Sequence, residues 1–147
     1  MTEAQKIAGK IISCFRRGNS VYICGNGGSA TQSSHFAAEF VNKYIKDRQP
    51  LPAYSLNDLA TITSIANDRG YEYIFSRQIE AYGKKGDILI SLSTSGKSLN
   101  VLNAMTQANK QGMVNIEFPR KGNNTGEIQN YHVALMHEIC KVVEEAF

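Results

Sequence analysis

Hydrophobic and polar positions group along the chain into blocks that predict strands and helices in turn. Two short runs, residues 21–24 and 88–92, are almost continuously apolar, which is typical of strands buried on both faces of a parallel sheet. Elsewhere the apolar residues recur at helical spacing, as Ile7, Ile11 and Cys14 do near the start of the chain. Glycine and proline residues separate these blocks and mark their ends.

The alternation of the predicted elements indicates the fold class. Helices are predicted over residues 2–17, 31–43, 58–66, 74–82, 99–111 and 127–147. Strands are predicted over residues 21–24, 53–56, 87–92 and 113–118. Strands that alternate with helices form a parallel sheet through right-handed crossovers, so we expect one α/β domain over residues 1–147, with helices on both faces.

Two polar turns connect a predicted strand to the helix after it, at residues 25–30 and 93–98. Ligands in parallel α/β folds bind at the carboxyl ends of strands, so the turns form one pocket if they lie side by side. The second turn offers four hydroxyls and the free N–H groups of a helix start, which suit a phosphate. In the alternative interpretation Ser98 is an ordinary N-cap and the other hydroxyls only form the turn.

The first turn, Gly25 to Ala30, matches a loose dinucleotide-binding pattern, G-x-G-x-x-A. The acidic residue that completes this pattern would be Asp58, which follows Ala30 by 28 residues rather than about 20. Asp58 also stands where a helix cap is expected. The glycines therefore fit better as residues that allow a tight turn and close packing of the helix on the sheet.

Two pairs of side chains are candidates for metal binding or proton transfer. His35 and Glu39 are four residues apart, so they share one face of a helix. Three interpretations are open: half of a metal site, a base with its partner, or a solvated surface pair. Gln129 and His137 are eight residues apart on the last helix, where they reach one pocket or remain solvated.

Two further polar residues have weaker signals. Asp68 is a predicted loop carboxylate just before Gly70, where it serves the turn or binds a sugar hydroxyl. His132 is interpreted as a packing or surface residue.

Composition narrows the class of protein. The chain has 147 residues, 42% of them hydrophobic and 20% charged, which fits one globular domain with a core. The net charge of +3 is scattered, so a small anionic substrate explains it and no nucleic acid partner is expected. Three distant cysteines predict reduced, packed thiols in a cytoplasmic protein. No signal peptide or membrane span is expected.

Five segments together resemble one protein family. They are CGNGGSA at 24–30, HFAAE at 35–39, AND with IFSRQ at 66–68 and 74–78, STSGKS at 93–98, and IQ at 128–129 with His132 and His137. In this order and spacing they resemble the sugar isomerase (SIS) domain family, and within it the phosphoheptose isomerases.

The resemblance implies a fold, an assembly and a reaction. The fold is a three-layer, flavodoxin-like α/β sandwich, and the assembly is a homotetramer with active sites at subunit interfaces. The reaction converts sedoheptulose 7-phosphate to D-glycero-D-manno-heptose 7-phosphate through an enediol. Its product supplies the heptose of lipopolysaccharide or related surface glycans.

The resemblance also implies roles for single residues. The phosphate is held by Ser93, Thr94, Ser95 and Ser98. The remainder of the substrate is contacted by Asn26, Gly27, Ser29, Asp68 and Gln129. Glu39 and His137 move the protons. One zinc ion per site is held by His35, Glu39, Gln129 and His137.

Three departures from the family pattern stand out. The N-terminal helix, residues 2–17, is a shorter arm for packing or oligomer formation than the family has. Lys97 and Lys43 are unexpected at their positions, and Lys97 adds charge beside the phosphate. Around residues 115–118 the family has a strand, a glycine-rich loop and a further strand. Either the protein truly lacks that segment, or the segment is a disordered loop that the printed sequence omits. Omission is favoured because the true loss of a strand would leave an open sheet edge.

Two other functions compete with the isomerase. One is a non-catalytic SIS protein, either a replication-initiation factor or a sugar-phosphate sensor. The replication-initiation proteins tend to lack the acid and the imidazole that match Glu39 and His137, and both residues are present here. The other is a dinucleotide-binding domain, which the hydroxyl-rich turn at 93–98 argues against. Catalysis is therefore favoured.

Overall fold

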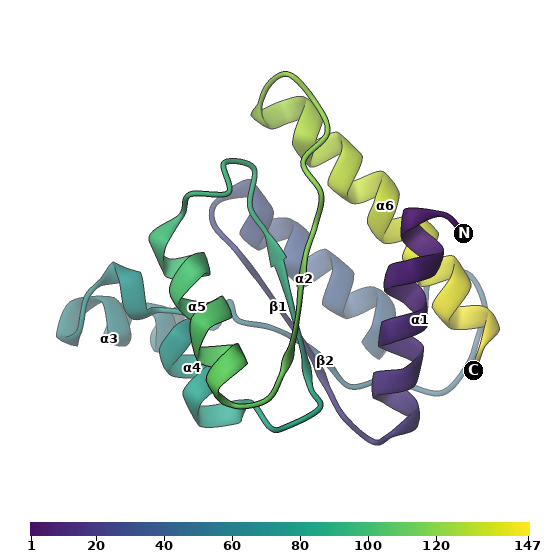
Figure 1. Cartoon of the computed structure of the whole chain (residues 1–147), viewed down its shortest axis with the longest axis horizontal. Helices are drawn as coiled ribbons and strands as arrows, with labels where there is room; N and C mark the ends of the chain where they lie inside the picture. Colours follow the sequence, from purple (N-terminus) through teal and green to yellow (C-terminus); the bar gives the residue numbers. More distant parts are fainter.

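The computed structural model describes all residues, 1–147, as a sheet between two layers of helices (Figure 1). The strands are β1 (Val21–Gly25), β2 (Ala53–Ser55), β3 (Ile88–Leu92) and β4 (Val114–Glu117). The helices are α1 (Glu3–Arg16), α2 (Gly28–Val41), α3 (Leu59–Asp68), α4 (Ser76–Tyr82), α5 (Leu99–Lys110) and α6 (Thr125–Glu145), with a 3₁₀ turn, η1, at Tyr71–Tyr73. The predicted alternation of strands and helices is confirmed.

All four strands are parallel, in the order β2-β1-β3-β4. This is the flavodoxin-like order, so the predicted fold class is confirmed. In the register, Val21 lies opposite both Ala53 and Ile88, and Ile88 lies opposite Val114. The carboxyl ends of β1 and β3 are therefore neighbours, which brings the two polar turns to the same edge of the sheet.

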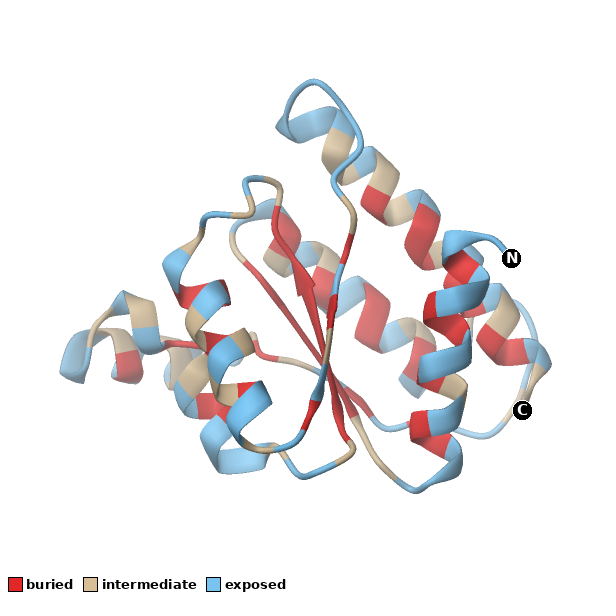
Figure 2. Cartoon of the chain, in the orientation of Figure 1, coloured by how far each residue is buried: buried red, intermediate tan, exposed pale blue.

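Two separate hydrophobic clusters hold the helices on the sheet (Figure 2). Val21 and Ile23 of β1 belong to the cluster shared with α1, α2 and α6. Tyr22 and Cys24, which point the opposite way, belong to the cluster shared with α4 and α5. Because both faces are covered, β1 and β3 are buried along their whole length, as their continuous apolar runs predicted.

Two differences from the predicted element boundaries affect residues of the candidate site. Helix α2 begins at Gly28 rather than near residue 31, because Gly27 turns the chain with φ of 56° and no side chain caps the helix. A start of this kind leaves no N-cap signal in the sequence. Asp68, predicted to lie in a loop, is instead the last residue of α3, and Gly70 turns the chain just after it.

Strand β4 forms one edge of the sheet, and the chain passes directly from it into the loop before α6. Val114 is partly exposed there, whereas Phe118, just after the strand, is fully buried. The described chain has no strand beyond β4. The expectation that a segment of the family pattern is missing at residues 115–118 stays a prediction.

The three cysteines are free and buried, as predicted. Burial raises the pKa of Cys14 to about 11 and that of Cys24 to about 12, which keeps both as thiols at neutral pH. They therefore behave as small apolar side chains. None of the helices has the length and apolar character needed to cross a membrane.

His132 makes the stability of this fold depend on pH. It is 1% exposed, its Nε2 lies 2.9 Å from the Pro119 carbonyl oxygen, and its Nδ1 is buried without a partner. Burial lowers its pKa below the ordinary value of 6.5. The unfolded chain therefore binds more protons as the pH falls below that value, which favours unfolding.

We expect the melting temperature to fall as the pH is lowered from 7.5 to 5.5. The fall should be about 3 °C for each 1 kcal/mol lost from the free energy of unfolding. Thermal melts of the wild type and of His132→Gln, which keeps a donor for the Pro119 carbonyl, would measure this. The variant should lose less stability than the wild type over this range. Parallel pH dependences in the two proteins would assign the effect to other groups.

Candidate active site

The two polar turns meet at the carboxyl edge of the sheet, as predicted. The Asn26 and Asn100 side-chain amides exchange two hydrogen bonds, of 2.8 and 2.9 Å, across this edge. The Tyr71 hydroxyl donates a third, of 3.0 Å, to Asn26 Oδ1. A pocket opens between the turns, lined by Asn26, Tyr71, Glu72, Ser98, Leu99 and Asn100.

The helices that start at this pocket have no side-chain caps. At the starts of α1, α3 and α6, a backbone N–H of the first turn donates a hydrogen bond to a capping side chain. The capping residues are Thr2, Asp58 and Asn124, respectively. No such bond is made at the start of α2 or α5, where Gly27 and Ser98 are the N-cap residues. Ser98 is therefore the N-cap residue of α5, as the alternative interpretation predicted, but its side chain makes no capping bond. Its hydroxyl and the N–H groups of the first turn of α5 are available to an anion, whereas in α2 the N–H groups of Ser29 and Ala30 already donate to the carbonyl oxygens of Asn26 and Gly27.

The hydroxyl-rich turn is shaped by two of its own serines. Ser93 Oγ accepts a hydrogen bond of 2.9 Å from the Gly96 N–H, and Ser95 Oγ accepts one of 3.0 Å from the Lys97 N–H. Both hydroxyls are acceptors in these bonds, so their hydrogens remain free to be donated. Gly96 has φ of 70°, a conformation that favours glycine. The turn thus keeps hydroxyl donors that no bond within it uses.

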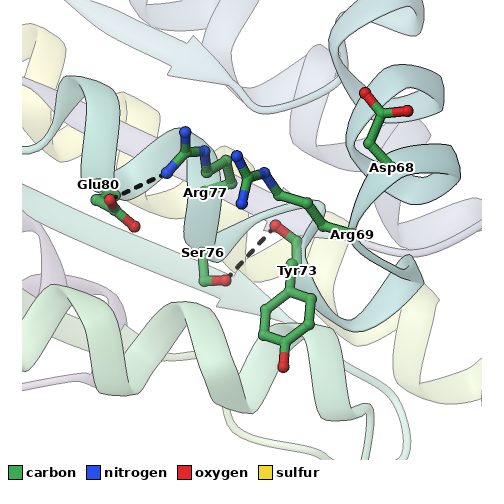
Figure 3. A pocket seen from close by; sticks show the side chains of 6 residues that line it. All are labelled: Asp68, Arg69, Tyr73, Ser76, Arg77 and Glu80. Atoms are coloured by element: carbon green, nitrogen blue, oxygen red, sulfur yellow. Dashed lines mark hydrogen bonds and ion pairs between the residues drawn. The ribbon is translucent and has the colours of Figure 1, made fainter.

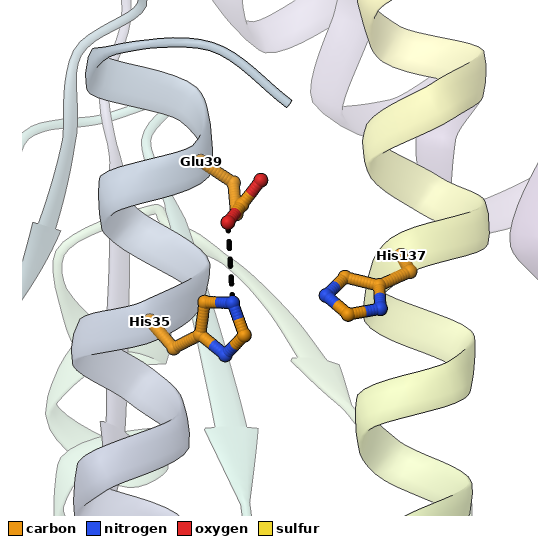
Figure 4. Close-up of side chains that lie close together, drawn as sticks. All are labelled: His35, Glu39 and His137. Carbon is orange, nitrogen blue, oxygen red and sulfur yellow. Dashed lines mark hydrogen bonds and ion pairs between the residues drawn. The ribbon is translucent and has the colours of Figure 1, made fainter. Parts of the chain in front are cut away.

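A second cluster lies between α2 and α6, where His35, Glu39 and His137 face one another (Figure 4). His35 Nε2 is 3.1 Å from Glu39 Oε1, and a ligand atom from each of the three lies within 4.8 Å of the others. The His35 and His137 rings meet edge to face, with centroids 5.3 Å apart. The spacing argument for His35 and Glu39 thus placed them correctly, and His137 joins them from the last helix.

Comparisons with known proteins identify the family of this chain. The SIS domain family matches residues 1–117. A phosphoheptose isomerase from Fusobacterium nucleatum is 41% identical, over 97% of this chain and 81% of its own. The chain belongs to the phosphoheptose isomerase family of SIS-domain proteins.

Solved structures of this family have the same fold. A phosphoheptose isomerase from Francisella tularensis superposes with a TM-score of 0.89 at 30% identity, and one from Neisseria gonorrhoeae with 0.87 at 30%. Each comparison covers 97% of this chain and 85% of the solved chain. The match to the Fusobacterium nucleatum relative spans 158 positions, although 97% of this chain is about 143 residues. The relative therefore has about 15 positions without a counterpart here.

Several residues assigned from the family pattern lie near these two clusters. Ser29 is buried in the first turn of α2, and Gly27 precedes that helix. The Gln129 side chain rests against Gly28, so closely that a Cβ there would lie 2.5 Å from Nε2. Gly28 is seven residues before His35 on α2, so Gln129 contacts this helix on the pocket side of the triad. Its part in substrate or metal binding stays a prediction.

Asp68 lies in a separate hollow beside α3 and α4 (Figure 3). The hollow is also lined by Arg69, Arg77 and Glu80, and Arg77 pairs with Glu80 at 3.1 Å. Asp68 Oδ1 accepts a hydrogen bond of 3.0 Å from the neighbouring Asn67 side chain. It does not line the pocket between the two turns, and its role in binding sugar stays a prediction.

Three residues near the pocket, Tyr71, Asn100 and Arg120, were missed by the sequence analysis. Asn100 fixes Asn26 although 74 residues separate them. Arg120 places its guanidinium against Gly96, where a Cβ would lie 2.6 Å from Cζ, and it forms an ion pair with Glu117. This puts a positive charge beside the hydroxyl-rich turn. Asn100 stands just after Ser98, which is a weak signal in the sequence, whereas Arg120 has none.

Proposed function

We propose that this protein interconverts sedoheptulose 7-phosphate and D-glycero-D-manno-heptose 7-phosphate, in the supply of heptose for lipopolysaccharide or related surface glycans. The observation that carries the proposal is the cluster of Glu39 with two imidazoles in a phosphoheptose isomerase fold. A protein that only bound a sugar phosphate would have no use for this acid and base pair. The uncapped turn at 93–98 supplies the place for the phosphate.

The reaction requires a proton to leave C1, a cis-enediol to form, and a proton to return to C2. Glu39 serves as the base at carbon, and His137 moves protons between the hydroxyl oxygens. Ser93, Thr94, Ser95 and Ser98 hold the phosphate far from the reacting carbons. That remote binding energy orients C1 and C2 against the catalytic groups.

The triad also fits a zinc ion. Two imidazole nitrogens and one carboxylate oxygen within 4.8 Å are the ligand types and number that catalytic zinc sites use, with a fourth position left open. His35, Glu39 and His137 would hold the ion, and Gln129 is proposed as a further ligand. When bound, zinc would polarise the substrate carbonyl.

We further propose that the protein works as a homotetramer whose sites lie between subunits. His35 and Glu39 follow Gly28 by 7 and 11 residues on α2, which places them about 10 to 16 Å along the helix from the pocket. Tyr71 and Leu99 at the pocket are 58% and 59% exposed, so a second copy would cover them. A neighbouring subunit then brings its own triad to this pocket.

The domain arrangement proposed with this function is a single SIS domain over residues 1–147, shortened near 115–118. The SIS match ends at residue 117, the last residue of β4, which supports that position for the missing segment. Helix α1 packs mainly on α6 and serves as the arm for assembly. Three free, buried thiols support a cytoplasmic location.

The proposal is tested by incubating the protein with sedoheptulose 7-phosphate, after exhaustive chelation and again with zinc restored. An aldose 7-phosphate should form, and zinc should raise the rate. Formation of no aldose in either sample, with binding of the ketose intact, would favour the non-catalytic sensor. Full activity after chelation would remove zinc from the mechanism and leave the isomerase.

Ser95→Ala tests the phosphate end of the pocket. The variant should raise KM about 10-fold, because a hydrogen bond to a charged group is worth about 1.5 kcal/mol, and should leave kcat nearly unchanged. Ser64→Ala, which removes an exposed hydroxyl from α3, is the matched control. Steady-state kinetics with both variants would measure the difference. An unchanged KM in Ser95→Ala would count against this turn as the phosphate site.

A further inference from the structure

The segment between α2 and β2, residues 42–52, has no helix or strand, yet it is tied to the body of the protein. An ion pair between this segment and α6 accounts for this, since Arg48 Nε lies 3.5 Å from Glu144 Oε2. Both side chains are almost fully buried, at 4% and 2% exposed. A buried pair is costly to form and costlier to break, so this one holds the segment in one place against the end of α6.

Glu144 also holds the backbone of the segment. Its carboxylate accepts hydrogen bonds from the N–H groups of Tyr44, at 2.8 Å, Ile45, at 2.7 Å, and Lys46. Burial alone would raise the pKa of Glu144, but these three N–H groups and the Arg48 charge outweigh it and lower the pKa. The carboxylate therefore stays charged at neutral pH and keeps the three residues in place.

Arg48 ties the segment to α2 by capping the C-terminal end of that helix. Its guanidinium donates to the carbonyl oxygens of Glu39, at 2.6 Å, Phe40, at 2.7 Å, and Asn42, at 3.1 Å. These carbonyls belong to the last turn of α2 and the residue after it, where no further helical N–H is available. The same side chain thus ties the segment to the backbone of Glu39, a member of the triad.

Tyr44 is the residue that this clamp presents to the triad. Its ring stacks on the His137 imidazole, with centroids 5.1 Å apart and planes 17° from parallel. The His35 ring meets the same imidazole edge to face. Neither His137 nitrogen has a hydrogen-bond partner in the chain, so ring contacts alone set the orientation of this side chain. In most metal-binding histidines, by contrast, a hydrogen bond from the second ring nitrogen sets the orientation of the ring.

We propose that Tyr44 is a positioning residue for His137, held in place by the Arg48–Glu144 pair. Stacking on the phenol ring keeps the imidazole turned toward Glu39 and His35, the orientation that metal binding and proton transfer require. The role extends the proposed function, on which it rests, to a residue outside the triad. Because the contact is made by the ring face, the hydroxyl is not needed for it.

The test compares Tyr44→Leu with Tyr44→Phe, which keeps the ring, and with Tyr82→Leu as the control. Tyr82 is likewise a partly exposed tyrosine stacked on another ring, Tyr22, but it lies on α4. Titration of each metal-free protein with zinc should show affinity about 10-fold weaker in Tyr44→Leu, the loss typical of orienting partners. Tyr44→Phe and Tyr82→Leu should stay within about twofold of the wild type, since neither alters the contact.

A second measurement uses no metal and no substrate. The NMR signals of the His137 ring protons should be shifted upfield by the Tyr44 ring in the wild type and in Tyr44→Phe, and this shift should vanish in Tyr44→Leu. Unchanged zinc affinity in a folded Tyr44→Leu protein, or unchanged His137 signals, would overturn the inference. If the wild type binds no zinc, the proposed metal site fails, and the NMR comparison decides the role of Tyr44 by itself.

Discussion

Replacing Glu39 by Gln is expected to lower kcat for sedoheptulose 7-phosphate by about 10²- to 10⁴-fold, the range that a positioned general base contributes. The amide keeps the size of the side chain but has no basic oxygen to accept a carbon-bound proton. Glu39 is only partly buried, and its contact with His35 joins residues of a single helix. The variant should therefore fold, and KM should change far less than kcat because the phosphate turn is untouched.

Glu138→Gln is the matched control for this experiment. It makes the same change of charge beside His137 in the sequence, but Glu138 is exposed and lies outside the triad. The control should keep wild-type kinetics, whereas His137→Ala should lose turnover as Glu39→Gln does. Near wild-type activity in either triad variant, measured with equal loading of zinc, would contradict the role assigned to that residue.

Gly25→Ala is expected to destabilise the protein by about 2 kcal/mol, within the range for groups forced into a packed interior. A Cβ at this position would lie 2.7 Å from the Leu92 carbonyl oxygen and 2.7 Å from Ser29 Cβ. Neither contact can be relieved by rotating a long side chain, so β1 or the start of α2 must move. Asn26 follows directly, and its bonds to Asn100 would be disturbed, so KM should rise as well.

Gly9→Ala provides the control, because a Cβ at Gly9 would meet nothing within 4 Å. Gly9 is an exposed residue inside α1, where alanine is favoured over glycine by about 1 kcal/mol. The same glycine-to-alanine change should thus stabilise one position and destabilise the other in urea unfolding. Equal stabilities for Gly25→Ala and the wild type would show that the turn has room that the structure does not indicate.

The sequence predicted the fold well because burial leaves a direct trace in it. The runs at 21–24 and 88–92 are apolar since both faces of the sheet are covered. Leu135, Ile139 and Val143 recur at helical spacing along α6 since that side of the helix rests on the core. The start of α2 was placed too late because Gly27 and Gly28 give no capping signal. Asp68 was predicted to lie in a loop because the turn residues after α3 do not show at which residue the helix ends.

The candidate site was only partly predictable, for a related reason. His35 and Glu39 are found by helical spacing, and the 93–98 turn by its hydroxyls next to a strand. Contacts between distant segments have no periodicity. The stacking of Tyr44 on His137 and the contact of Arg120 with Gly96 join elements that only the folded sheet brings together.

The bare helix starts at the pocket imply a trade between stability and binding. A threonine, aspartate or asparagine cap contributes about 1 kcal/mol to a helix, and this protein uses such caps on α1, α3 and α6. At α2 and α5 it forgoes about 2 kcal/mol in total, a sizeable share of the net stability of a small domain. The amides left open at the start of α5 allow a bound anion to act as the capping group, so a phosphorylated ligand is expected to raise the melting temperature.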